Sequence, residues 1–361
     1  MWPYWLLLLW PAFLAISRLS SSPLVFSTFG RARWPERWLP FFISLVLMIG
    51  LRHEVGGDWL TYLQMLDSYT DITNSREFVF QDPAFVLFNR LAAHTGLGIY
   101  LLNFLSAVVF SYGLMVFSSA QPRSWLAVVV AVPYLITVVA MGYTRQGAAI
   151  GIAMVGMVAL SAGRSWRFIL WIVLAALFHK SAVILLPMAF LANTKRYMFQ
   201  FSGMVAVVFT LYALLLQESM SFLIYGYIES QYQSSGAAIR IAMNALPGVL
   251  FLVFLKRFQL SPEQRIFWAW MAWGSLIFVV LLIISPSSTA VDRVALYWIP
   301  LQLFVLSRLP DALGQIGGKN AGWVYAVVAY SAAVHFIWLV YADTAFAWLP
   351  YQFYPWVWLW Q

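Results

Sequence analysis

The apolar segment FILWIVLAALFHKSAVILLPMAFLA (residues 168–192) decides how this chain folds through a membrane. If the segment crosses the membrane once, seven basic residues that follow it lie on the opposite side of the membrane from the earlier basic loops. They are Lys195, Arg196, Lys256, Arg257, Arg265, Arg308 and Lys319. If it enters and returns, one face holds 14 basic and 3 acidic residues. Because Lys and Arg gather in cytoplasmic loops, the charge distribution favours a returning segment.

The length of segment 168–192 supports the same interpretation. Each half is a helix of roughly 18 Å at 1.5 Å per residue, which is too short to cross the hydrocarbon core. A re-entrant or broken helical pair, with FHKS (178–181) near its apex, fits this length. Irregular backbone at such depth is tolerated where protein or water surrounds it. The alternative is a single tilted span that leaves the following charges on the wrong side.

The composition places the whole chain in a membrane. Hydrophobic residues make up 63% of it, 9% are charged, and the mean hydropathy is +0.80, whereas soluble domains are about 45–50% apolar. The apolar runs are continuous, unlike the alternating segments of a β-barrel. We therefore predict an all-α polytopic membrane protein with a single domain over residues 1–361. The net charge of +8 fits basic cytoplasmic loops and does not indicate nucleic acid.

About ten apolar segments predict transmembrane helices, at residues 1–17, 38–51, 98–119, 125–142, 147–162, 201–216, 237–255, 266–284, 289–306 and 321–341. The first lacks a basic n-region and a cleavage site, so we predict a retained span. The basic loop 18–37 then lies in the cytoplasm, and both termini lie on the outer, periplasmic side. Loops 52–97 and 217–236 are predicted on the outer face. An amphipathic interfacial helix is expected after residue 58.

Ionisable residues in or beside these spans collect toward the outer face in this topology. They are Arg52, Asp58, Arg145, His179, Lys180, Arg240, Asp292 and Arg293. Such groups are costly in apolar surroundings and are functional hypotheses by default. The arginines point to a phosphate or pyrophosphate, because a guanidinium pairs with oxyanions bidentately and stays charged. Snorkelling to lipid headgroups or pairing with a carboxylate is the alternative for each one.

The other notable residues allow two interpretations each. Gly56-Gly57 predicts either a tight turn or a close approach of backbone amides to a ligand. His179 is either a general base or a packed helix residue. The chain has no cysteine, and it contains no Walker A loop, HExxH helix or GxSxG elbow.

The segment LRHEVGGDWLTYLQM (51–65) resembles the R-x-x-V/I-G-x-D-x-x-x-Y signature of the EpsG family, the Wzy-like polymerases of bacterial exopolysaccharide and O-antigen. Its members here are Arg52, Gly56, Asp58 and Tyr62. Similar segments follow in the family's order: DPAFVLFNRLAAHTG (82–96), TRQGAAIGIAM (144–154), LAALFHKSAVILLP (174–187), DRVALYW (292–298) and WLPYQ (348–352). Asp82 and Ala84 stand where the family usually has Glu and Gly.

The resemblance implies a membrane glycosyltransferase of GT-C-like architecture in the bacterial cytoplasmic (inner) membrane. It would join oligosaccharide repeat units carried on polyprenyl pyrophosphate, such as undecaprenyl pyrophosphate, at the outer face. The expected partners are this lipid-linked donor and acceptor, membrane lipid, and flippase and chain-length regulator proteins. A flippase of the same lipid-linked sugars is one alternative, although internal repeats typical of transporters are absent from the sequence. An O-antigen ligase-type transferase is the other.

In this chemistry pyrophosphate leaves the anomeric carbon while an acceptor hydroxyl attacks it. Arg52, Arg145, Arg240 and Arg293 are the expected pyrophosphate ligands, and either Asp58 or His179 takes the acceptor's proton. The expected supporting residues are Gly56, Gly57, Tyr62, Gln146, Lys180, Asp292 and Tyr351. Four arginines can replace a divalent metal and no D-x-D motif is present, so we expect metal-independent catalysis without a cofactor.

Overall fold

The structure, a computed structural model, describes residues 1–19, 38–68, 82–191, 234 and 236–359. In these residues the regular structure is helical, apart from one isolated bridge between Arg52 and Phe353. The main helices are α1 (Trp2–Ser17), α2 (Trp38–Gly50), α3 (Trp59–Ser68), α5 (Pro83–His94), α6 (Gly98–Ser119), α7 (Ser124–Ala131), α8 (Thr144–Ser161), α9 (Ser165–Ala176), α10 (Met188–Leu191), α13 (Ala237–Val253), α14 (Pro262–Ile284), α15 (Ser288–Ala295), α16 (Ile299–Leu313), α17 (Ala321–Tyr341) and α18 (Tyr354–Leu359). The expected span 201–216 and most of the loops 18–37 and 217–236 lie outside the described residues.

Four helical segments are long and apolar enough to cross a membrane: α6, α14, the run Ser288–Leu313 that contains α15 and α16, and α17. Six shorter apolar helices accompany them in the described residues, at Trp2–Ser17, Trp38–Gly50, Ser124–Ala140, Ser165–Ala176, Lys180–Leu191 and Ala237–Val253. This architecture fits a multi-pass helical membrane protein. The number of about ten spans and the GT-C-like arrangement stay predictions.

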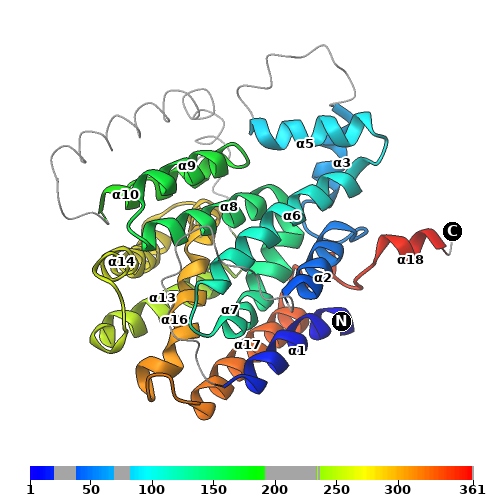
Figure 1. The fold of residues 1–361 in the computed structure, drawn as a ribbon. Coiled ribbons are helices and arrows are strands. Elements are labelled where there is room, and N and C mark those ends of the chain that lie inside the picture. The colour runs from blue at the N-terminus through cyan, green and yellow to red at the C-terminus, as the bar shows by residue number, and fades with distance from the viewer. Residues whose placement is uncertain (20–37, 69–81, 192–233, 235, 360–361) are drawn as a thin grey trace.

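Segment 168–192 is broken in the middle. Helix α9 ends at Ala176, His179 has an extended backbone, and the 3₁₀ helix η2 (Lys180–Leu185) and α10 run back beside α9 (Figure 1). The turn keeps its backbone bonded, with the His179 N–H on the Ala175 carbonyl at 3.0 Å and the Ala182 N–H on the His179 carbonyl at 3.0 Å. Such internal bonding is what irregular backbone at membrane depth requires. The chain reversal therefore places His179 at the tip of a helical pair.

Helices α6 and α8 pack at very short range in the centre of the molecule. A Cβ atom on Gly113 would lie 1.9 Å from the Gly151 carbonyl oxygen, and one on Gly151 would lie 2.6 Å from the Cα atom of Phe110. In a membrane, small residues stabilise helix pairs because they let the backbones approach closely. This contact fixes the position of α8 relative to α6, and α8 carries Arg145 in its first turn.

A π-helix precedes α8. Helix α7 continues as η1 (Val132–Ala140), and all of its residues are buried. The Trp348 Nε1–H from the C-terminal segment donates to the Thr137 carbonyl of this π-helix at 2.8 Å. π-helical turns occur frequently at functional sites. Here the π-helix leads directly into the turn between Gly142 and Arg145.

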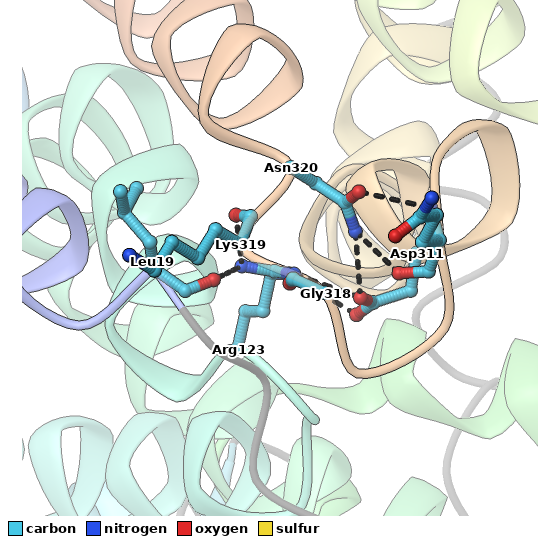
Figure 2. Close-up of polar contacts among 7 residues, drawn as sticks. Leu19, Arg123, Asp311, Gly318, Lys319 and Asn320 are labelled. Atoms are coloured by element: carbon cyan, nitrogen blue, oxygen red, sulfur yellow. Dashed lines mark hydrogen bonds and ion pairs between the residues drawn. The ribbon is translucent and has the colours of Figure 1, made fainter.

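A buried polar cluster around Arg123 joins several helices near the C-terminal end of α6. At 1.5 Å per residue this end lies roughly 33 Å from the start of α6. Arg123, at the start of α7, makes a bidentate ion pair with Asp311 at 2.8 and 3.1 Å. It also donates to the carbonyls of Leu19 and Gly318, as Figure 2 shows. Asn320 holds Asp311 from the other side at 3.2 Å. These bonds tie the ends of α1, α7, α16 and α17 together.

The N-terminal helix α1 contacts the segment that follows α17, and both chain ends lie on the same side of the view in Figure 1. The Tyr4 hydroxyl of α1 donates to the Trp348 carbonyl at 2.7 Å. The Tyr351 hydroxyl donates to the Met48 carbonyl of α2 at 2.9 Å. That both termini lie on the outer side of the membrane stays a prediction from the sequence.

The returning segment 168–192 predicts opposite labelling of two exposed positions. The native chain has no cysteine, so each single-cysteine variant reports one site. In intact cells, Glu54→Cys should react with a membrane-impermeant maleimide, whereas Lys256→Cys should react only after permeabilisation. Labelling of Lys256→Cys from outside would contradict the returning segment.

Candidate functional site

Arg52 holds together the turn that follows α2, and its side chain is 1% exposed. Its Nε–H donates to the Val55 carbonyl at 3.0 Å, and an Nη1–H donates to the Ile49 carbonyl. Its Nη2 group donates to Asn103 Oδ1 at 3.0 Å and to Thr144 Oγ1 at 2.7 Å. One guanidinium therefore joins the end of α2, the middle of the turn, α6 and α8.

The C-terminal segment covers the same turn. The His53 N–H donates to the Gln352 carbonyl at 3.0 Å, and the Gly56 N–H donates to the Ala347 carbonyl at 2.8 Å. The Tyr354 N–H returns a bond to the Leu51 carbonyl at 2.8 Å. Four of the five N–H groups of Arg52 thus bind protein acceptors beneath a covered turn. This geometry is that of a residue that positions the turn, and Arg52 does not lie among the more exposed arginines.

The Gly56-Gly57 pair forms a tight turn, and Gly56 is the residue that requires glycine. Its φ is +113°, and a Cβ atom there would lie 2.3 Å from the Met141 carbonyl oxygen. Gly57 has no positive φ and lies beside the Trp348 ring. The turn directs Asp58 toward the start of α8, where its N–H lies 3.4 Å from the Gly142 carbonyl.

Asp58 is a half-buried carboxylate that faces two arginines. The Tyr62 hydroxyl hydrogen-bonds to it, and the Arg145 backbone N–H donates to the Tyr62 oxygen at 3.3 Å. Burial raises the pKa of the Asp58 carboxyl, while the positive charges of Arg293 and Arg145 act in the opposite direction. The turn after α2, helix α3 and helix α8 therefore converge on one ionisable group.

Arg145 is paired with Asp82, the residue immediately before α5. Arg145 Nη1 lies 2.9 Å from Asp82 Oδ2, and 34% of the Arg145 side chain is exposed. The other Asp82 oxygen accepts the Lys180 N–H at 3.0 Å. Burial raises the pKa of Asp82, and the charge of Arg145 opposes this effect. Asp82 thus links the Arg145 side chain to the tip of the broken pair.

Arg293 enters the site from α15. Its guanidinium carbon lies 4.2 Å from the centre of the Tyr143 ring, which is a close cation–π contact. The Gln146 amide donates to the Arg293 carbonyl at 2.6 Å and holds this part of α15 against α8. Arg293 and Arg145 both act electrostatically on Asp58, so the structure brings these three residues together.

Arg240 lies next to this group but is engaged by a carboxylate. Its Nε and Nη2 lie 2.8 and 2.7 Å from the two oxygens of Asp292, and Ser234 bonds to the same carboxylate at 3.0 Å. A bidentate pair of this kind fixes the guanidinium plane. Because Asp292 precedes Arg293 in the chain, the pair also holds the middle of α15 in place.

His179 lies with two hydroxyl groups at the tip of the broken pair. Its Nδ1 atom is 2.5 Å from Ser181 Oγ and 3.5 Å from the Tyr297 hydroxyl oxygen. The charges of Arg145, Arg293 and Lys180 all act on its ring. His179 is therefore close to the arginines that flank Asp58.

The structure gathers most of the predicted residues and sets others apart. Asp58, Tyr62, Arg145, Gln146, His179, Lys180 and Arg293 form one group, which we call the arginine–carboxylate site. Gly56 and Gly57 form its supporting turn, and Arg240 with Asp292 flanks it. Arg52 and Tyr351 lie beneath and beside the turn. Among the described residues, no group of three or more His, Cys, Asp or Glu side chains could hold a metal ion.

Several contributors were not predicted as site residues. Asp82, Tyr143, Ser181 and Tyr297 touch the arginines or His179. Asn103 and Thr144 hold Arg52. The sequence alone could have identified Asn103 as a contact residue, because an amide within an apolar span needs a polar partner.

The family model described as the EpsG family matches residues 38–353. The chain belongs to the EpsG family. The matched range includes every residue of the arginine–carboxylate site, and it confirms the resemblance in the sequence. The family fits a polysaccharide-polymerase-like membrane protein. No curated protein and no solved structure matches the chain.

The buried position of Arg52 predicts a large loss of stability when it is removed. Arg52→Ala leaves four acceptors without their donor, and an unpaired buried group costs about 1–3 kcal/mol. We expect the free energy of unfolding in detergent to fall by about 3 kcal/mol or more. Arg257→Ala, at an exposed position between α13 and α14, is the control and should change it by less than about 0.5 kcal/mol. Equal melting temperatures for the two variants would contradict a positioning role.

Proposed function

We propose that this protein is a polysaccharide polymerase. It joins oligosaccharide repeat units carried on polyprenyl pyrophosphate, at the outer face of the bacterial cytoplasmic membrane. The observation that carries the proposal is the juxtaposition of Asp58 with Arg145 and Arg293 in a membrane protein of the EpsG family. A transfer from a lipid pyrophosphate needs both a base for the acceptor and cations for the leaving group.

The geometry divides the four arginines into two pairs with different roles. Arg145 and Arg293 are partly exposed and act on the same carboxylate, so we assign them to the pyrophosphate. Arg52 is buried on protein acceptors and positions the turn that carries Asp58. Arg240 is held by both Asp292 oxygens and positions Arg293 through the neighbouring Asp292 of α15.

Asp58 is the base in this proposal. Its carboxylate takes the proton of an acceptor hydroxyl, whose oxygen forms a bond to the anomeric carbon of the donor sugar. The bond from that carbon to the pyrophosphate oxygen breaks, and its electron pair leaves with the pyrophosphate. Arg145 and Arg293 stabilise the charge that develops there. With these cations in place we propose a metal-independent reaction.

The cellular setting follows from the substrate. A flippase must deliver the lipid-linked unit to the outer leaflet, and a chain-length regulator would limit the product, so both classes of protein are proposed partners. The GT-C-like arrangement is proposed with them, since it combines a membrane-embedded bundle with an active site at one membrane face.

The function is tested by incubating purified protein with a polyprenyl-pyrophosphate-linked repeat unit and separating the products on a gel. We expect a ladder of polymer lengths. Arg145→Ala and Arg293→Ala should each lower ladder synthesis at least about 100-fold, because each removes preorganised charge at the leaving group. Arg257→Ala, at an exposed site away from α8 and α15, should retain it.

Two other results would overturn the proposal in distinct ways. Unchanged lipid-linked substrate that crosses the bilayer of proteoliposomes would identify a flippase. Transfer of one unit to a lipid A core, without a ladder, would identify a ligase-type transferase.

The electrostatics of Asp58 predict the acid limb of the pH–rate profile. Because the base must be ionised, the rate falls as the pH decreases through the raised pKa of Asp58. The Tyr62 hydrogen bond lowers this pKa, so Tyr62→Phe should raise it and move the acid limb to higher pH. A limb at the same pH in wild type and Tyr62→Phe would exclude Asp58 as the titrating base.

A further inference from the structure

Hydrogen bonds hold both the backbone and the ring of His179, and they determine which ring nitrogen is available to a substrate. Its backbone is held on both sides by the Ala175 carbonyl and the Ala182 N–H, each at 3.0 Å. In the described residues both side-chain hydrogen bonds of the ring use Nδ1, one with Ser181 and one with Tyr297. The ring therefore presents Nε2 as the atom available to a substrate.

The buried hydroxyl of Tyr297 limits how the hydrogens of Tyr297, Ser181 and His179 can be arranged. Its side chain is 0% exposed, and its oxygen lies 3.2 Å from Ser181 Oγ. A buried phenol hydrogen without an acceptor is unfavourable, because the group has lost its hydrogen bonds to water and gained none in return. If Ser181 donates to Tyr297, the phenol hydrogen has Nδ1 as its acceptor at 3.5 Å, and Nδ1 is an acceptor in this arrangement too. If Tyr297 donates to Ser181, every hydrogen in the chain is used.

The second direction also fixes the tautomer of His179. Ser181 has one hydroxyl hydrogen, and with its oxygen accepting from Tyr297 that hydrogen goes to Nδ1 at 2.5 Å. Nδ1 is then an acceptor, so the neutral ring carries its hydrogen on Nε2. Burial of the ring disfavours a second proton, and the positive charges of Arg145, Arg293 and Lys180 around it act in the same direction. His179 is thereby kept neutral and donating.

We propose that His179 is a neutral hydrogen-bond donor to a phosphate oxygen of the bound lipid pyrophosphate, and that Tyr297 and Ser181 hold its hydrogen on Nε2. The pyrophosphate is the anion that Arg145 and Arg293 bind, so this proposal rests on the proposed function. The acceptor proton goes to Asp58, and the Nε2–H bond stays intact throughout. Ser181 and Tyr297 are positioning residues that act through the ring.

Two substitutions of His179 separate a donor from a base. A glutamine side chain can place an amide N–H near the position of Nε2, yet it cannot accept a proton as a base. His179→Gln should therefore lower ladder synthesis by less than about 10-fold, whereas His179→Met should lower it at least about 100-fold. Equally inactive His179→Gln and His179→Met proteins with wild-type melting temperatures would overturn the proposal.

Binding provides a readout that does not depend on catalysis. We expect the Kd for polyprenyl pyrophosphate to rise at least about 10-fold in His179→Met and less than about 3-fold in His179→Gln. Tyr297→Phe removes the buried hydroxyl whose hydrogen keeps Nδ1 an acceptor, and it should weaken binding severalfold. The matched control is Tyr4→Phe, which removes an equally buried hydroxyl bound to the Trp348 carbonyl and should leave Kd unchanged.

The outcomes distinguish this inference from the proposed function. If wild type binds pyrophosphate through His179 but makes no ladder, the polymerase proposal fails and the donor assignment stands. If the ladder forms while all three variants of His179 and Tyr297 bind as wild type does, the donor assignment fails and the polymerase stands.

Discussion

The Arg52 guanidinium is the interaction on which the rest of the site depends. It is a buried charge in an apolar bundle, and such a charge is tolerated only when its donors are satisfied. The acceptors that satisfy it come from α2, from the turn that follows, from α6 and from α8. Any arrangement that moves one of these elements leaves either the charge or its acceptors unpaired. The position of Asp58, three residues after Val55, is therefore fixed relative to Arg145, the residue after Thr144.

The same constraint explains why the chain returns to this place at its C-terminus. The segment after α17 pairs its backbone with the turn, and Trp348 packs beneath it with its indole N–H on the π-helix. A turn with a positive-φ glycine and exposed amides would otherwise leave backbone groups unpaired in a water-poor region. The closing segment satisfies several of them through its own backbone groups. The geometry of the arginine–carboxylate site and the pairing of the turn's backbone groups thus come from one set of contacts.

Part of this could be predicted from residue order alone. The break near His179 followed from two half-segments that are each too short to span. The grouping of Asp58 and Arg145 followed from the topology, which places both toward the outer face. The separate roles of Arg52 and Arg145 could not be predicted, because both are arginines beside apolar spans. The difference lies in partners distant in sequence, Asn103 and Thr144 for Arg52 and Asp82 for Arg145. Likewise, nothing local to Ser181 indicates the buried Tyr297 that orients it.

The central claim is that a lipid pyrophosphate lies between Arg145 and Arg293, beside the His179 tip. The most direct measurement is a cryo-electron microscopy map of the protein in a lipid nanodisc with polyprenyl pyrophosphate bound. The account predicts diphosphate density in contact with both guanidinium groups and with His179 Nε2, while Arg52 keeps its bonds to Asn103 and Thr144. Density at the opposite end of α6, beside Arg123, with none between Arg145 and Arg293, would contradict it.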